Sequence, residues 1–249
     1  MKFSSNLAQR LFLCMTPFVT GSVFVSLPSF AATLSTSEAA VILNNFSHNP
    51  ESVAAVADTS AYTQITNSGE VATNAYGEAA FIPYTSAPQT FAYNLSSSSV
   101  KGEGNNYLGQ AQSTAGVLGY NFIIGAGETF SFNFNAALAL DTSVDDPSRE
   151  SADAVGNIAF MLYNSTDMNN PLDFFTLSGK LTSQGNDDFL SADHSTSVSF
   201  EENNAISSQG TEESAVAYIQ GWFARSFSTL THLTLVEFKT NEANACAWK

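Results

Sequence analysis

Alternation of apolar and polar side chains at positions 128–140 constrains the fold more than any other feature of this chain. Every second residue is apolar, and the set is Phe130, Phe132, Phe134, Ala136, Leu138 and Leu140. The positions between them begin with Thr129, Ser131, Asn133 and Asn135. Successive side chains of a strand point to opposite faces of a sheet. The segment therefore predicts a strand with one buried face and one wet face.

Shorter segments with similar patterns predict further strands, at positions 41–46, 70–81, 117–124, 158–162, 172–177, 195–201, 215–227 and 232–239. The turn signal Gly125-Ala126-Gly127 predicts a β-hairpin over 117–140. Asn49-Pro50 resembles a helix cap followed by a first-turn proline, which predicts one short helix near residues 50–57. The pattern as a whole favours an all-β fold, a single antiparallel β-sandwich of jelly-roll-like type.

The first residues read as an export signal. Lys2 and Arg10 precede a mostly apolar stretch, and Ser29-Phe30-Ala31 offers a cleavage site for signal peptidase. We therefore expect a signal peptide at 1–31, a sandwich domain at 32–240 and a flexible C-terminal tail at 241–249. The expected location is periplasmic or extracellular, with no membrane anchor. Cys14 lies in the signal, which leaves Cys246 in the tail, where it either pairs with a second chain or, as we expect, stays a free thiol.

Charge narrows the range of partners. Cleavage would remove two of the eight basic side chains and none of the 23 acidic ones. Such an acidic chain repels nucleic acid and anionic membrane surfaces. Carboxylates are, however, suitable calcium ligands. The candidate calcium ligands lie in two acidic segments and are Asp141, Asp145, Asp146, Glu150, Asp187 and Asp188. No other cofactor is expected.

No catalytic motif stands out. His48, His194 and His232 have no metal-binding spacing. Asp193-His194-Ser195 holds the residue types of a hydrolase triad, but neighbours on a strand point to opposite faces. Paired acids such as those at 201–202 keep glycoside hydrolysis open as a second alternative. The expectation is a protein that is not an enzyme.

Carbohydrate binding is the first alternative function, because exported sandwiches often stack sugars on exposed aromatic rings. Trp222 is the candidate sugar contact, although its strand position is compatible with burial as well as exposure. Several tyrosines could add to such a site, namely Tyr62, Tyr76, Tyr84, Tyr93 and Tyr107.

Four strings over roughly 105–239 resemble cyanobacterial exported β-sandwich proteins of the PEP-CTERM type. They are Gly-Glu-Thr-Phe-Ser-Phe-Asn-Phe at 127–134, Leu-Asp-Phe-Phe-Thr-Leu-Ser-Gly at 172–179, Gly-Asn-Asp-Asp-Phe at 185–189 and Leu-Thr-Leu-Val-Glu-Phe-Lys at 233–239. The resemblance implies a surface or matrix component and no catalytic residues. The chain departs from that type because residues 241–249 lack the C-terminal sorting tail. We expect an exported, non-enzymatic cell-envelope or extracellular matrix protein, with extracellular polysaccharide or other envelope proteins as partners.

Overall fold

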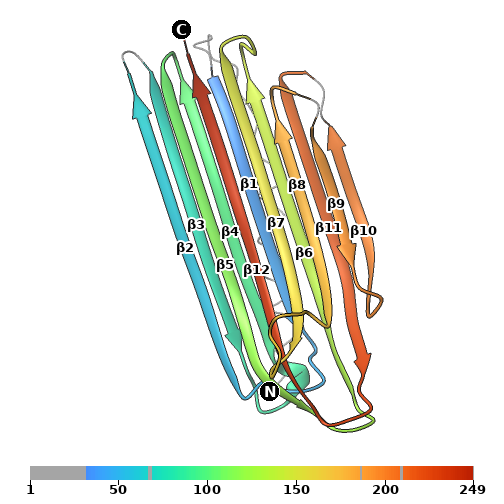
Figure 1. Cartoon of the computed structure of the whole chain (residues 1–249). Helices are drawn as coiled ribbons and strands as arrows, with labels where there is room; N and C mark the ends of the chain where they lie inside the picture. Colours follow the sequence, from blue (N-terminus) through green and yellow to red (C-terminus); the bar gives the residue numbers. More distant parts are fainter. Residues whose placement is uncertain (1–31, 67–68, 186, 208–209, 249) are drawn as a thin grey trace. The chain divides into compact units, whose positions relative to one another are not determined.

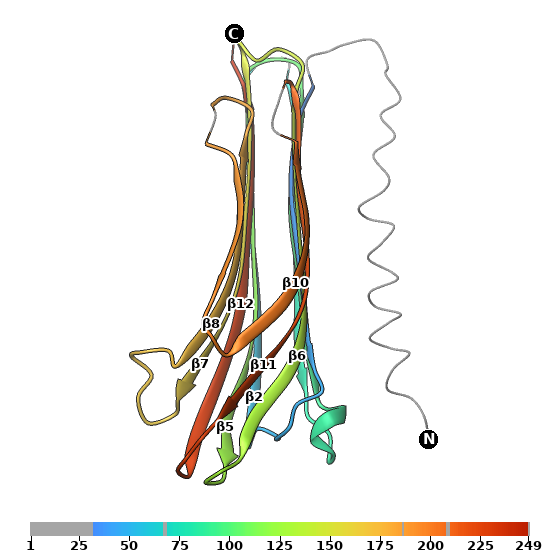
Figure 2. The ribbon, with the colours of Figure 1, turned by 90° about the vertical axis from the view of Figure 1, so that its right-hand side faces the viewer.

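The computed structural model describes residues 32–66, 69–185, 187–207 and 210–248. The predicted signal peptide lies outside these residues. The described chain forms two antiparallel six-stranded sheets that lie face to face as a sandwich (Figures 1 and 2). The expectation of an all-β sandwich is confirmed.

Sheet A has the strand order β10-β11-β6-β1-β4-β3. In chain order its members are β1 (Ala32–Asn44), β3 (Glu70–Ile82), β4 (Phe91–Glu103), β6 (Thr129–Val144), β10 (Val198–Ser207) and β11 (Glu212–Ser226). A 3-10 turn, η1 (Ala87–Gln89), precedes β4.

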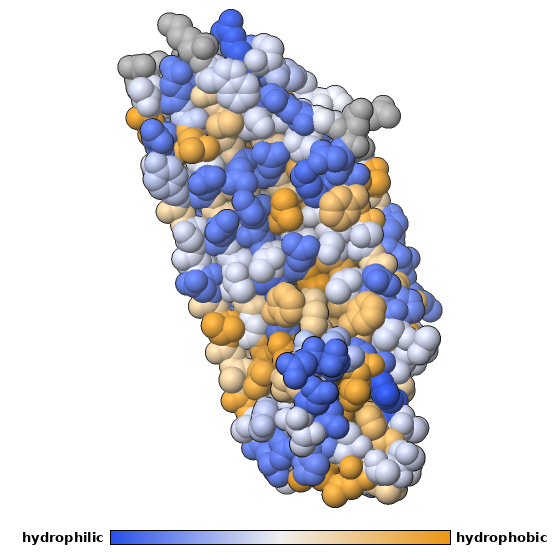
Figure 3. Space-filling model, viewed as in Figure 1, coloured by the Kyte–Doolittle hydropathy of each residue, from blue (hydrophilic) through white to orange (hydrophobic). Residues whose placement is uncertain are grey.

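Sheet B has the strand order β2-β5-β12-β7-β8-β9. In chain order its members are β2 (Ser52–Ile65), β5 (Tyr107–Ile124), β7 (Glu150–Asn164), β8 (Asp173–Thr182), β9 (Phe189–His194) and β12 (Thr231–Ala247). The outer face of this sheet is turned to the viewer in Figure 3, where apolar side chains are scattered among hydrophilic ones.

The alternation in β6 is confirmed residue by residue. Its apolar set faces the space between the sheets, whereas Asn133 and Asn135 lie on the outer face. Phe130, Phe132 and Phe134 meet aromatic rings from other strands in a cluster of fully buried phenylalanines. The cluster comprises Phe46, Phe122, Phe130, Phe132, Phe134, Phe160, Phe175 and Phe223. This cluster is the apolar core that joins the two sheets.

A second stretch of the interior is polar. Hydroxyl and amide side chains fill it, together with a few charged groups, and the set includes Thr33, Ser35, Ser37, Asn94, Ser96, Ser98, Ser113, Glu237, Lys239 and Asn241. Many bond across the gap, as when Ser98 Oγ lies 3.0 Å from Ser113 Oγ and 3.1 Å from the Asn241 carbonyl oxygen. Buried polar groups are tolerated when they are paired in this way.

Three local predictions are wrong. Residues 52–57 begin strand β2, not a helix, because the Asn49 side chain bonds to the 84–90 loop instead of capping a helix. The predicted hairpin over 117–140 is wrong because β5 and β6 belong to opposite sheets, although Gly127 (φ +84°) does form the expected turn. Residues 241–247 are not a flexible tail, since they complete β12 between β5 and β7.

Cys246 accordingly lies half-buried on β12, where burial raises the pKa of its thiol. Across the described part of the chain, no helix has the length and apolar character needed to cross a bilayer.

Candidate functional site

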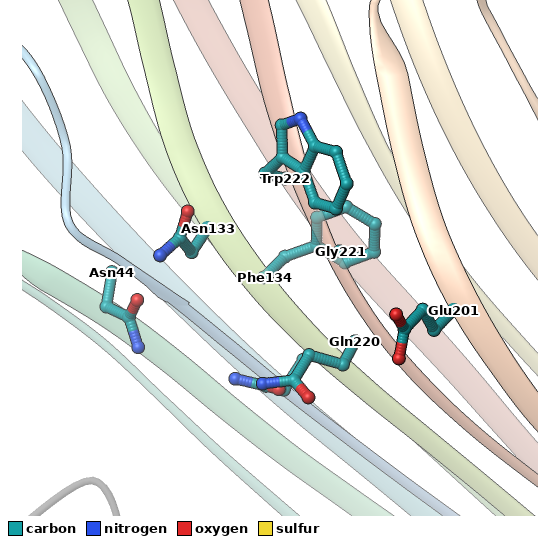
Figure 4. Close-up of a pocket in the computed structure, with 8 residues that line it drawn as sticks. Asn44, Asn133, Phe134, Glu201, Gln220, Gly221 and Trp222 are labelled. Atoms are coloured by element: carbon teal, nitrogen blue, oxygen red, sulfur yellow. The ribbon is translucent and has the colours of Figure 1, made fainter.

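The outer face of sheet A carries a shallow pocket around Trp222, with a volume of about 360 Å³ (Figure 4). Four neighbouring strands supply its lining, which is Asn44, Asn133, Phe134, Asn135, Glu201, Gln220, Gly221 and Trp222. A volume of this size is near the lower end of the range for small-molecule sites. We call this site the Trp222 pocket.

Strand register brings the lining together in two rows. Asn44 lies opposite Asn133, and Asn133 lies opposite Trp222. One step along the sheet, Asn135 lies opposite Gln220, which lies opposite Glu201. Directly opposed residues of antiparallel strands share a face, so their side chains project together from the outer surface.

Gly221 fixes the orientation of Trp222. A Cβ at position 221 would lie 2.5 Å from Phe134 Cζ and 2.6 Å from the carbonyl oxygen of Ser199, so the Phe134 ring occupies the space of a side chain there. Ile219 and Phe223 also face the core. Strand alternation then places Trp222 outside, where its side chain is 52% exposed.

The polar groups of the pocket are available to a ligand. Among the described residues, the side chains of Asn44, Asn133, Gln220 and Glu201 form no hydrogen bond with protein, and they surround the hollow beside the indole (Figure 4). Asn135 Oδ1 accepts a long hydrogen bond of 3.5 Å from the Tyr218 hydroxyl. A carboxamide both donates and accepts hydrogen bonds, which suits it to ligands rich in hydroxyl groups.

Aromatic side chains continue across sheet A on the far side of the amides. Phe91 and Tyr93 of β4 lie opposite Asn44 and Ile42 of β1. The Phe91 ring stacks between those of Tyr84 and Tyr93, with centroid distances of 6.2 and 6.3 Å. Three strand spacings, or about 14 Å, separate β4 from β11. The outer face of sheet A thus has aromatic side chains on both sides of an amide strip.

Two of the segments that hold the predicted calcium ligands lie side by side, but their carboxylates are engaged by protein groups. Residues 183–185 meet the 145–150 loop, since Gln184 Nε2 donates to the carbonyl oxygens of Pro147 (3.0 Å) and Glu150 (2.7 Å). Glu150 is buried and accepts the Asp145 and Asp146 N–H groups at 2.8 and 3.0 Å.

The remaining predicted calcium ligands also have protein partners. Asp141 lies on the outer face of β6, where Thr36 Oγ1 donates to it at 3.3 Å. Asp187 pairs with Lys180, and Asp188 accepts the Thr182 N–H at 2.8 Å. Within the ranges that the structure describes, no three His, Cys, Asp or Glu side chains are placed to hold a metal ion. Calcium binding stays a prediction.

The other sequence candidates do not meet in one site. Ser195 Oγ donates to Asp173 at 2.8 Å and not to His194, so positions 193–195 do not form a hydrolase triad. Tyr107 is buried, which raises its pKa to about 12 and removes it as a sugar contact. Of the residues that the sequence singled out, two line the pocket: Trp222, the candidate sugar contact, and Glu201, one of the paired acids.

No protein family, curated protein or solved structure matches this chain.

Proposed function

We propose that the protein is an exported, non-enzymatic component of a cell envelope or extracellular matrix that binds polysaccharide at the Trp222 pocket. One observation carries the proposal: an exposed indole stands beside unpaired carboxamides on one flat sheet face. The C–H face of a sugar ring packs on an indole, and the hydroxyl groups at its rim take up amide hydrogen bonds. The proposal that the protein is exported is based on the signal peptide predicted at residues 1–31.

The arrangement suits a chain of sugars better than a single sugar. The amide strip separates Trp222 from Phe91 and Tyr93 by about 14 Å, and all of these residues lie on the outer face of one sheet. A glycan running across the strands would contact aromatic rings at both ends and amides between them. Such contacts are spread over several sugar units.

Charge favours a neutral glycan. The chain carries a formal charge of −15, and Glu201 adds a carboxylate to the lining. An acidic polysaccharide would meet like charge on approach, which slows encounter and weakens binding. Neutral polysaccharides avoid that cost.

Binding without cleavage is supported by the acids at the site. Glycoside hydrolysis uses a pair of carboxyl groups on either side of the scissile bond. Glu201 is the one carboxylate in the lining of the pocket. Glu38 and Asp141 share this outer face and have raised pKa values, mainly through burial, but neither lines the pocket.

Replacing Trp222 should weaken glycan binding. We expect Trp222→Ala to lower the affinity for a neutral polysaccharide at least about tenfold, because removal of a main aromatic contact typically costs more than about 1.4 kcal/mol. The measurement is affinity electrophoresis through gels containing soluble glucan, xylan, mannan or galactan, with alginate as an acidic comparison.

Trp248→Ala is the matched control. Trp248 is also exposed, but it lies beyond the end of β12 and not in the pocket. This variant should migrate like the parent protein in every gel. A parent protein that none of the neutral polysaccharides retards, or a Trp222→Ala variant retarded as strongly as the parent, would refute the proposal.

A further inference from the structure

Strand β2 is the least protected sheet edge in the described chain. It bonds to β5 on one side and lies at the end of sheet B. Its 14 residues are exposed almost throughout and include one charge, Asp58, with no lysine or proline. Natural edge strands usually avoid pairing with other chains through charges, prolines or short length.

The other three edges carry such protection. Each holds charged side chains or is short: β3 contains Glu70 and Glu78, β10 contains Glu201 and Glu202, and β9 has six residues that include Asp193. The difference matters because an exposed edge presents a row of unpaired backbone N–H and C=O groups. Those groups are best satisfied by another strand.

The sequence of β2 is complementary to itself in the antiparallel direction. A two-fold axis at Thr59 sets Val56 opposite Tyr62 and Val53 opposite Ile65 of a second copy. The same register sets Ala57 opposite Ala61, and it sets Asp58 opposite Ser60, so that no like charges meet. Each of these pairs shares a face, because the two members differ by an even number of positions.

The apolar members of these pairs are the side chains that most need a partner. Val56 is 61% exposed and Tyr62 is 51% exposed in the single chain, and Ile65 is exposed as well. Cross-strand pairs of an aromatic and a β-branched residue are among those that stabilise antiparallel sheets. The exposure of these side chains in the single chain and the complementarity of the sequence about Thr59 are separate arguments for the pairing.

We propose that β2 pairs antiparallel with β2 of a second copy of this chain, joining two copies of sheet B into one continuous sheet. The pairing would add about one inter-strand hydrogen bond per paired residue. A two-fold contact of this kind uses the same surface on both subunits and closes at the dimer. The outer faces of both copies of sheet A stay free, so the dimer would present two Trp222 pockets to one polysaccharide.

Cysteine cross-linking tests the register directly. In a Cys246→Ser background, Thr59→Cys places two cysteines opposite each other across the axis, within the Cα separation that a disulfide spans. Thr63→Cys is the matched control, because it lies on the same strand, the same face and an equally exposed position but faces Ala55 of the second copy. Under mild oxidation with copper phenanthroline, we expect covalent dimers of the Thr59→Cys protein and monomers of the Thr63→Cys protein.

Sedimentation equilibrium adds a second measurement that needs no cysteine. The parent protein should have twice the mass of one chain, and Val56→Lys should halve it by placing a charge at the edge. Leu230→Lys, at an equally exposed leucine in a turn, should keep the dimer. A monomeric parent protein would overturn the proposal, as would equal cross-linking at positions 59 and 63 or a Val56→Lys variant that remains dimeric.

Discussion

Phe132→Ala should lower the free energy of unfolding by about 3–5 kcal/mol, the cost typical of a buried phenylalanine that leaves a cavity. The Phe132 ring lies at the centre of the apolar core. Its centroid is 5.4 Å from that of Phe46, 5.3 Å from Phe160 and 5.2 Å from Phe223. Phe160 belongs to sheet B and Phe223 to sheet A, so truncation removes contacts that hold the two layers together. Close-packed interiors of this kind relax only partly around a missing ring.

Urea unfolding of the parent and variant proteins measures the effect. Phe189→Ala is the control, because Phe189 is 43% exposed and begins the short edge strand β9. It should change the free energy of unfolding by less than about 1 kcal/mol. Equal losses at positions 132 and 189 would contradict the assignment of the 128–140 alternation to a buried and a wet face.

Removing either member of the Glu237 and Lys239 pair should cost about 3–5 kcal/mol, since it leaves the other group buried without its opposite charge. Both side chains project from β12 into the polar part of the interior. Asn94 connects them. Its side-chain amide donates to Glu237 Oε2, and its backbone carbonyl oxygen accepts from Lys239 Nζ. Glu237 Oε1 and Asn94 Oδ1 are buried without a hydrogen-bond partner among the described residues.

A double-mutant cycle separates the interaction between Glu237 and Lys239 from the cost of burying each group. We expect Glu237→Gln and Lys239→Met each to be strongly destabilising, and the double variant to be less destabilised than the sum of the two. Glu237 and Lys239 influence each other electrostatically without forming a salt bridge, and replacement of two such buried charges by uncharged groups is often close to neutral. Additive single effects would show that the two charges do not interact.

The pH dependence of stability is a second test of the burial of Glu237 and Lys239. Burial raises the pKa of Glu237 from 4.5 to about 7 and lowers the pKa of Lys239 from 10.5 to about 7. Between pH 4.5 and 7 the folded chain keeps a proton on Glu237 that the unfolded chain has lost, so stability falls as pH rises. Between pH 7 and 10.5 the unfolded chain keeps a proton on Lys239 that the folded chain has lost, so stability rises.

The contribution of the pair is therefore smallest near pH 7. We expect the difference in free energy of unfolding, parent protein minus Glu237→Gln and Lys239→Met double variant, to be smallest at that pH. A difference that is flat from pH 5 to 9 would contradict the buried placement of these two groups.

The sequence predicted the fold class well where burial follows the strand period. The 128–140 segment is the clearest case, because its core face is apolar at every position. The same reasoning failed in β12, whose core face is Leu233, Leu235, Glu237 and Lys239 while Val236 and Phe238 lie outside. Charged residues are rarely buried, so no pattern in one strand could reveal that polar side chains from opposite sheets meet there.

Strand β2 and the end of β12 show how pairing decides a local structure. The alanine-rich start of β2 is compatible with helix, and pairing with β5 makes it a strand. Residues 241–247 lack large apolar side chains and so resemble a tail. They lie between β5 and β7, where small residues such as Ala243 and Ala245 fill a narrow interior. Tertiary context overrides weak local preference in both cases.

The candidate site was predictable only in part. Trp222 attracts notice in the sequence because the chain has two tryptophans. Asn44, Asn133 and Gln220 do not, because each is an ordinary polar residue until strand register places it near Trp222. Glu201 was noted only as one of several paired acids, and strand register places it opposite Gln220. The signal that would have marked Trp222 as exposed is the Gly221 before it, whose missing side chain makes room for Phe134.

Fluorescence of single-tryptophan variants tests polysaccharide binding at the Trp222 pocket most directly. Trp248→Phe leaves Trp222 as the one indole among the described residues, and Trp222→Phe leaves Trp248. Titration with the neutral polysaccharide that most retards the parent protein should shift and saturate the emission of the Trp248→Phe variant, while that of the Trp222→Phe variant stays constant. A saturable change from Trp248 alone, or from neither tryptophan, would contradict the proposed site.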